Sequence, residues 1–247
     1  ESSRKVRQAE AALRVERAKL AASEKEVQNL KNRIDLFSGL DGAKGKRIGK
    51  KSKGKPGTAT AVILLSDLHV EETVLPEKVN GLNEYNLDIA DKSIKEVFRR
   101  SLNLLEHERH LVNIKDVVLW CGGDFLSGFI HDELMEGNSL SPLAACRWAK
   151  ERVLGGIDFL LENADINSLK IVTSYGNHGR TTHKRRIATG SDNSYEYDMY
   201  LSMRDSVVDD RVSWQIGEGY LNYIDIQDHV CRFHHGDAMK YHGAIGV

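Results

Sequence analysis

Four short groups of polar residues in this 247-residue chain combine carboxylate, imidazole and amide side chains. They read Ser66-Asp67-Leu68-His69, Cys121-Gly122-Gly123-Asp124, Tyr175-Gly176-Asn177-His178 and His234-His235-Gly236-Asp237. Each group follows a short apolar run of the kind that forms a buried strand. One such group alone is more typical of a turn or a helix cap. Four in this order predict a metal site, since oxygen and imidazole ligands suit Mn²⁺, Fe or Zn²⁺ better than thiolate ligation does.

The elements that must position these groups alternate between strands and helices. The runs 61–65, 117–120 and 169–173 predict buried strands, and the segments 87–111 and 193–208 predict helices. Another helix begins at Ser141-Pro142, a favoured cap residue followed by proline. In open α/β sheets ligands bind beyond the carboxyl ends of the strands, so we expect the polar groups to meet at one edge.

The last part of the chain has a different pattern. Short apolar runs at 212–216, 220–226 and 230–234 are separated by Gly-Glu-Gly and Gln-Asp. Such spacing predicts successive antiparallel strands, which would make a second, β-rich sheet.

The motif series Asp67-x-His69, Gly123-Asp124, Gly176-Asn177-His178 and His235-Gly236 resembles the calcineurin-like metallophosphoesterase family, over about residues 60–237. The resemblance implies an α/β sandwich of two mixed β-sheets flanked by helices. It implies that Asp67 and His69 hold one divalent ion, that Asp124 bridges two ions, and that Asn177 and His235 hold the second. The expected ions are two Mn²⁺, with Fe or Zn as alternatives.

By the same resemblance, His178 would contact the scissile phosphate and protonate the leaving oxygen. Two cations held in this way would clamp the phosphate oxygens and activate a water molecule for in-line attack. General acid assistance is worth about 10²–10⁴-fold in rate. The sequence is therefore expected to encode a metal-dependent phosphoesterase.

Two departures from the family pattern stand out. The family usually has an acid after Asn-His, whereas this chain has Gly179-Arg180, and Arg180 could bind the substrate phosphate through both arms of its guanidinium. In the family, a closing Gly-His-x-His motif would supply one ligand to each metal. This chain lacks that motif, and His242 is not part of such a sequence. We therefore expect a domain that is C-terminally incomplete in this chain, or one that holds metal poorly. The Gly-Asn-His-Gly-Arg wording is similar to the phage-encoded branch.

Other polar residues near the motifs have two interpretations. His131 and His183 could line a substrate groove or be exposed, and Lys184, Arg185 and Arg186 could steer a nucleic-acid strand or form a solvated loop. Strand alternation should turn His235 toward the metals and His234 away. Trp120 and Trp148 are expected in the core.

Residues 1–38 are expected to form a long helix, because residues 3–37 lack Gly and Pro and are rich in good helix formers. An apolar residue recurs every seven positions at Val6, Leu13, Leu20, Val27 and Ile34. The second seam position (Ala9, Glu16, Ser23, Leu30, Phe37) is apolar mainly toward its C-terminal end. The helix could form a coiled coil and a homo-oligomer through residues 3–37, or lie on its own domain.

Residues 39–58 form a basic Gly/Lys linker, and residues 59–247 form the predicted metallophosphoesterase domain. Residues 1–58 hold 16 Lys/Arg against 7 Asp/Glu, and the remainder holds 19 against 29. A basic arm on an acidic body favours a partner that carries phosphate, such as nucleic acid. A solvated tether is the alternative for the linker.

The composition excludes several classes. No apolar stretch is long enough to span a membrane, and Cys121, Cys146 and Cys231 show no disulfide or zinc spacing. A reducing cytoplasm is expected, that of the host if the protein is phage-encoded. The expected function is a phosphodiesterase or nuclease. A phosphomonoesterase and a catalytically impaired binding or assembly module are the alternatives.

Overall fold

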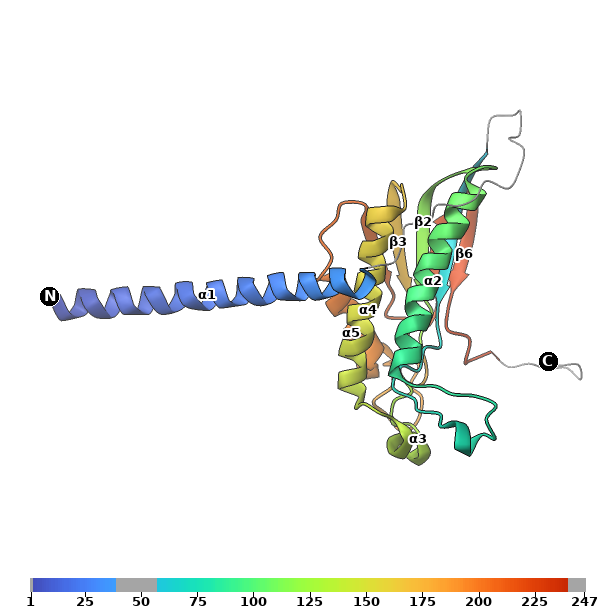
Figure 1. The fold of residues 1–247 in the computed structure, drawn as a ribbon, viewed down its shortest axis with the longest axis horizontal. Helices are drawn as coiled ribbons and strands as arrows, with labels where there is room; N and C mark the ends of the chain where they lie inside the picture. The colour runs from blue at the N-terminus through green and yellow to red at the C-terminus, as the bar shows by residue number, and fades with distance from the viewer. Residues whose placement is uncertain (1, 39–56, 240–247) are drawn as a thin grey trace, which may run out of the picture.

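A computed structural model describes residues 2–38 and 57–239 of the chain (Figure 1). The helices are α1 (Ser2–Phe37), α2 (Leu87–Glu108), α3 (Asp132–Gly137), α4 (Pro142–Asn163) and α5 (Tyr195–Arg204), with 3-10 turns at Pro76–Lys78 and Ser191–Asn193. The strands are β1 (Thr58–Leu65), β2 (Asn113–Cys121), β3 (Ser168–Thr173), β4 (Val212–Ile216), β5 (Asn222–Ile226) and β6 (His229–Phe233). The body is therefore α/β and is preceded by a long helix, as predicted.

The larger sheet has the order β1-β2-β3-β4, and all its strands are parallel. Helices α2, α4 and α5 connect successive strands, and right-handed crossovers in this order place all three on one face. The prediction that Val212–Ile216 is antiparallel is wrong. Because the ten residues of α5 supply a crossover between β3 and β4, β4 returns in the direction of β3.

The core between the sheet and its helices is apolar and closely packed. Ile94, Phe98 and Leu102 of α2 are fully buried, as are Leu119 of β2 and Ile171 of β3. The spacing of four residues from Ile94 to Phe98 to Leu102 places these side chains on one face of α2. Asn86 caps the N-terminus of this helix by accepting two backbone N–H groups.

The smaller sheet is an antiparallel hairpin of β5 and β6 on the other face of the large sheet. Ile224 and Phe233 of the hairpin pack against Val118 and Val172 of the central strands. The expectation of two mixed sheets is therefore wrong for the described residues, where one sheet is parallel and the other antiparallel. Two sheets and a helical layer are nevertheless present.

Helix α1 extends away from the body, and its C-terminal end packs against α4 (Figure 1). Buried Arg33 donates to the Asp158 carboxylate at 2.8 Å, and Leu36 lies against the core. Leu13, Leu20 and Val27 are roughly half exposed. Only the last turns therefore lie on the body. The basic linker over residues 39–56 and His242 lie outside the described residues.

Within the described ranges, no helix is both long and apolar enough to cross a membrane. Cys121 is buried, Cys146 and Cys231 are partly buried, and all three are free thiols. Trp120 is half-buried against Phe233, and Trp148 packs at the edge of the main core. Both tryptophans thus contribute to packing, as expected from the sequence.

Candidate metal centre

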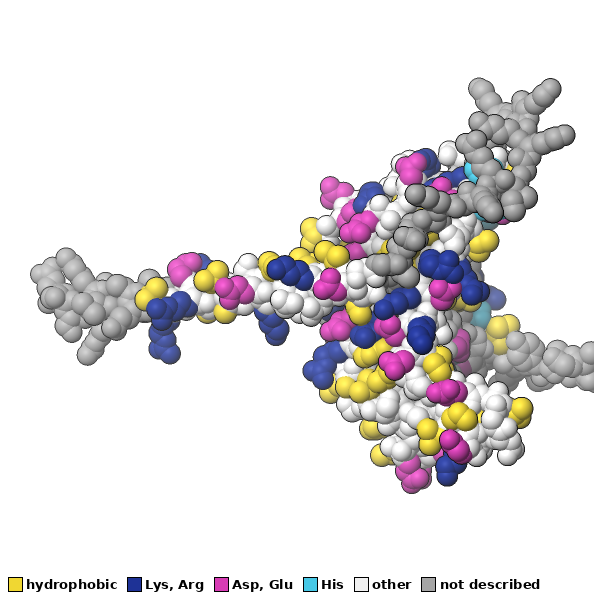
Figure 2. All heavy atoms as spheres, in the orientation of Figure 1, with side chains coloured by type: hydrophobic (Ala, Val, Ile, Leu, Met, Phe, Trp, Pro, Cys, Tyr) yellow, Lys and Arg dark blue, Asp and Glu magenta, His cyan; other side chains and the backbone are white. Residues whose placement is uncertain are grey.

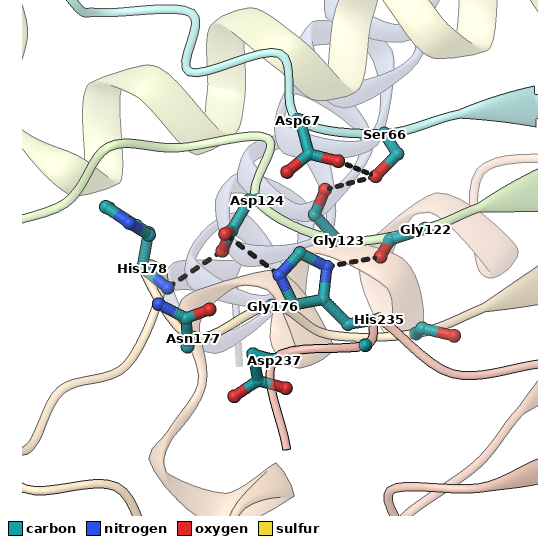
Figure 3. A network of polar contacts seen from close by, with 12 residues as sticks. Ser66, Asp67, Gly122, Gly123, Asp124, Gly176, Asn177, His178, His235 and Asp237 are labelled. Atoms are coloured by element: carbon teal, nitrogen blue, oxygen red, sulfur yellow. Dashed lines mark hydrogen bonds and ion pairs between the residues drawn. The ribbon is translucent and has the colours of Figure 1, made fainter. Parts of the chain in front are cut away.

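The four polar groups meet at the carboxyl edge of the parallel sheet (Figure 3). The turns after β1, β2 and β3 carry Asp67, Asp124 and His178, and the turn after β6 brings His235 to the same place. Backbone hydrogen bonds join the first two turns, because the N–H groups of Asp67 and His69 donate to the carbonyls of Gly123 and Asp124. The first two ligand-bearing turns are therefore held together by backbone hydrogen bonds.

Asp124 is at the centre of the arrangement and is almost fully buried. Its Oδ1 accepts the backbone N–H of His178 at 2.8 Å, and its Oδ2 lies 2.9 Å from Nε2 of His235. Burial raises the pKa of the Asp124 carboxyl, but its bonds to His235 and His178 outweigh this effect, so the pKa is lowered overall. Asp124 is accordingly a carboxylate with one oxygen toward each side of the site.

His235 is oriented by a carbonyl behind it. Its Nδ1 lies 2.8 Å from the carbonyl oxygen of Gly122, and a carbonyl only accepts, so Nδ1 carries a hydrogen. This leaves Nε2 directed at Asp124, which is the usual arrangement of a metal-binding histidine. Burial lowers the pKa of His235, but the Asp124 carboxylate outweighs burial and raises the pKa to about 9.

His69 and His178 stand together on the opposite side of Asp124. Their rings meet edge to face with centroids 4.7 Å apart. Ser127 orients both rings, since its carbonyl accepts Nδ1–H of His178 at 3.0 Å and its hydroxyl lies 3.2 Å from Nδ1 of His69. Burial is the main cause that lowers the pKa of His69. A neutral imidazole is the form that can bind a metal.

The ligand atoms form two groups that share Asp124. One group contains His69, Asp124 and His178, the other contains Asp67, Asp124 and His235, and within each the atoms lie within 4.8 Å of one another. Two ligands at right angles, each about 2.1 Å from one cation, would be about 3 Å apart. The 2.9 Å between Asp124 and His235 fits that spacing on their side of the site, and the other group also combines a carboxylate with imidazoles that could hold a metal ion.

This grouping differs from the expected one. The resemblance pairs Asp67 with His69 and Asn177 with His235, whereas the structure groups Asp67 with His235 and His69 with His178 around Asp124. Asn177 is labelled beside His178 in the close view and is half-buried. The shared position of Asp124 is the same in both arrangements.

Two of the turns approach each other so closely that only glycine fits. A Cβ on Gly176 would lie 2.0 Å from Oδ1 of Asp124. Asp67, His69 and Asp124 themselves have positive φ angles of 54°, 42° and 51°, a region that non-glycine residues seldom occupy. Such outliers gather at functional sites.

Two buried glutamates near the cluster were not identified from the sequence. Glu196 of α5 accepts backbone N–H groups from both the Asp124 and the Gly176 turns. Burial, with the Asp124 charge, raises the pKa of Glu196 to about 7. Glu71 accepts the backbone N–H of Gly128 at 2.9 Å, and burial raises its pKa. Their partners are backbone groups, so no side-chain spacing in the sequence could reveal either role.

The guanidinium of Arg180 holds the loop that follows the third motif. It donates to the carbonyls of Asn177, Thr182 and His183 at 2.6–3.2 Å. These bonds use three of its five N–H groups. Arg180 also lines the pocket beside the cluster, so its expected role in binding phosphate stays a prediction.

A pocket beside the cluster is lined in part by Asn177, Arg185, Arg186 and Tyr220. The Arg185 guanidinium lies over the ring of Tyr220, 4.8 Å from its centroid, and pairs with Asp237 at 2.8 Å. The pocket therefore combines cationic and aromatic groups next to the candidate ligands.

The remaining polar candidates lie apart from the metal ligands. The side chains of His131, His183 and Lys184 are exposed. His234 turns away from the cluster and packs at a tilt against Tyr220, with ring centroids 5.6 Å apart. Of the two neighbouring histidines, it is His235 that reaches Asp124.

Models of known protein families gave no match to this chain, and a search of curated protein sequences also found none.

Proposed function

We propose that this protein is a phosphoester hydrolase that uses two divalent metal ions at the Asp124 cluster. The observation that carries the proposal is the shared carboxylate, because Asp124 belongs to two separate groups of candidate ligands. A carboxylate shared by two ligand groups could hold two ions side by side, as two-metal catalysis needs. The motif order that resembles the calcineurin-like metallophosphoesterases points to the same chemistry.

Different residues of the cluster would bind the two ions and transfer a proton. Asp67 and His235 would bind on one side of Asp124, and His69 on the other, with Asn177 as a further neutral oxygen donor. When bound, the two ions would neutralise charge on the phosphate and activate a water molecule as the nucleophile. His178 donates Nδ1–H to the Ser127 carbonyl, which leaves its Nε2 available to exchange a proton with the leaving oxygen.

Nucleic acid is the substrate class that we favour. Arg185 and Arg186 line the pocket next to Asn177, and Arg185 lies over the Tyr220 ring while it pairs with Asp237. Cationic side chains beside the candidate ligands suit a phosphodiester backbone. The basic composition of residues 1–58 would add further attraction to phosphate.

The test begins with metal content and then compares substrates. We expect the purified chain to bind close to two equivalents of Mn²⁺ and to hydrolyse bis-p-nitrophenyl phosphate in preference to the monoester. It should also nick DNA when Mn²⁺ is present. Absence of metal and of hydrolysis after Mn²⁺ addition would refute the hydrolase. A preference for the monoester would instead identify a phosphomonoesterase.

A second candidate is a metallophosphoesterase-like module that has lost catalysis and serves in binding or assembly. The feature that favours it is the exposed apolar seam of α1. This alternative predicts stable association through α1 together with no hydrolysis at any Mn²⁺ concentration.

We also propose that α1 pairs with α1 of a second copy in a parallel coiled coil. Leu13, Leu20, Val27, Leu30 and Ile34 are each between 45% and 60% exposed. Figure 2 shows hydrophobic and charged side chains interspersed along the projecting part of this helix. A second copy would cover this seam.

Charges beside the seam fit a parallel partner in register. In a heptad with Leu20 and Val27 at the first core position, Lys19 would face Glu24 of the second copy, and Glu26 would face Lys31. Both contacts bring opposite charges together and occur twice in a symmetric dimer. Glu16 and Ser23 are polar seam positions that weaken the N-terminal half and help to fix the register.

A further inference from the structure

We infer that Glu196 is a positioning residue that fixes the two metal-binding turns relative to each other. It lies on α5, outside every motif that the sequence suggested, and it is fully buried. The inference rests on the proposed metal site, although its geometric basis is independent of any bound ion.

The carboxylate of Glu196 joins two segments that are about fifty residues apart in the chain. Its Oε1 accepts the backbone N–H of Phe125 at 2.5 Å and lies 3.4 Å from that of Leu126. Its Oε2 accepts the backbone N–H of Gly176 at 2.7 Å and lies 3.3 Å from that of Asp124. One oxygen thus holds the turn after β2, and the other ties that turn to the turn after β3.

Both turns need an outside acceptor at this point. Their N–H groups are buried at the end of the sheet, and a buried donor without a partner costs about 1–3 kcal/mol. A carboxylate supplies acceptors on both oxygens, and bonds from an ionised acceptor are about twice as strong as neutral ones. Since Asp124 and Asn177 are carried by these turns, Glu196 sets the distance between them.

Glu196 acts through Asp124 and Asn177 and does not itself reach the substrate side. Residues behind metal ligands commonly change metal affinity by about 10–100-fold when they are replaced. We therefore expect loss of Glu196 to appear mainly as weaker metal binding, which excess metal can overcome.

Gly179 provides a way to test this placement from the other side. A Cβ built on Gly179 would lie 2.8 Å from Cγ and 3.1 Å from Cδ of Glu196. The glycine therefore leaves the space that the glutamate occupies. A short acidic side chain at position 179 would deliver its carboxylate close to the same spot, provided that Glu196 had been shortened.

The first measurement is Mn²⁺ titration of the metal-stripped full chain, followed by the free Mn²⁺ signal in electron paramagnetic resonance. Glu196→Gln places an amide N–H against backbone N–H donors, so affinity should fall about 10–100-fold. Glu162→Gln, the same change at an exposed carboxylate on α4, should leave affinity unchanged. Hydrolysis by Glu196→Gln should recover at saturating Mn²⁺.

The rescue experiment separates positioning from general stability. Glu196→Ala should bind Mn²⁺ more weakly than Glu196→Gln. Adding Gly179→Asp to Glu196→Ala should raise the Mn²⁺ affinity of that variant by at least about tenfold. If Glu196→Ala does not fold, Gly179→Ala in the otherwise unchanged chain should weaken Mn²⁺ binding by displacing the carboxylate. Unchanged affinity in a folded Glu196→Gln, or no gain from Gly179→Asp, would overturn the inference.

Amide hydrogen exchange distinguishes failure of this inference from failure of the proposed function. In the metal-free protein, exchange in segments 121–128 and 174–180 should be faster in Glu196→Gln than in the unchanged chain. If the unchanged chain binds no Mn²⁺ but exchange is still faster in Glu196→Gln, the metal proposal fails and the positioning role of Glu196 is supported. If exchange is the same in Glu196→Gln and the unchanged chain, the positioning role is refuted.

Discussion

At the carboxyl edge of the parallel sheet, Asp124 and Glu196 are buried, and each bonds to groups from more than one turn. On α1, by contrast, Glu16 and Lys19 form an ion pair that is exposed to water. The polar residues at the sheet edge have fixed positions because their partners come from different strands and turns. Those on α1 are positioned only by their own helix along most of its length. This contrast indicates chemistry at the edge and association along the helix.

Asp124→Ala is expected to have the largest effect, because it tests whether the edge of the sheet is the metal site. Since Asp124 belongs to both ligand groups, we expect loss of both equivalents of Mn²⁺ and of all metal-dependent hydrolysis. Metal analysis and a bis-p-nitrophenyl phosphate assay measure the two effects. Asp225→Ala, at an exposed carboxylate on β5, is the matched control. Full activity in Asp124→Ala would show that the edge of the sheet is not the active site.

His178→Ala separates acid catalysis from metal binding. We expect kcat to fall by about 10²–10⁴-fold while Mn²⁺ remains bound, because the proposed role of His178 is proton transfer. His183→Ala, at an exposed histidine of the following loop, should have wild-type kinetics. Loss of metal from His178→Ala would instead place His178 among the ligands, as its proximity to His69 and Asp124 allows.

The point where α1 meets the body can be tested with Arg33→Ala. The Arg33–Asp158 pair lies 2.7 Å apart, with Arg33 buried and Asp158 partly exposed. Removing the guanidinium leaves Asp158 without its cation, which should cost about 2–3 kcal/mol, somewhat less than for a fully buried pair. Thermal unfolding and proteolysis near residue 33 measure the change. Arg100→Ala, in an exposed pair on α2, should unfold like the unchanged chain.

The smallest expected effect concerns the orientation of the α1 pair. Lys19→Glu should weaken dimerisation about tenfold, because it places like charges opposite each other twice in a parallel dimer. Adding Glu24→Lys should restore the dimer, as measured by sedimentation at several concentrations. Rescue by Glu26→Lys but not by Glu24→Lys would indicate antiparallel helices, and a monomeric unchanged chain would refute the coiled coil.

The positions of the ligand-bearing turns could be predicted because a parallel sheet brings its carboxyl ends together. Apolar runs before Asp67, Asp124 and Asn177 were enough to place these residues at one edge. The α/β class and the long N-terminal helix followed from the same kind of pattern.

Other features could not be predicted, for physical reasons. A five-residue strand such as β4 has no directional signal, so its parallel pairing depends on recognising α5 as a crossover. Glu71 and Glu196 bond to backbone N–H groups, which nearly every residue offers. Arg33 is a charged residue beside the helix seam, and its burial depends on Asp158, 125 positions away.

The left-handed backbone at Asp67, His69 and Asp124 lowers the stability of the fold at the positions where the site needs its ligands. Each such residue costs the folded state about 1–3 kcal/mol, and glycine would remove much of that cost. Glycine, however, has no side chain with which to bind a metal. Random substitutions selected only for higher thermal stability should therefore accumulate at this edge of the sheet, and their benefit to stability would come at the expense of metal binding.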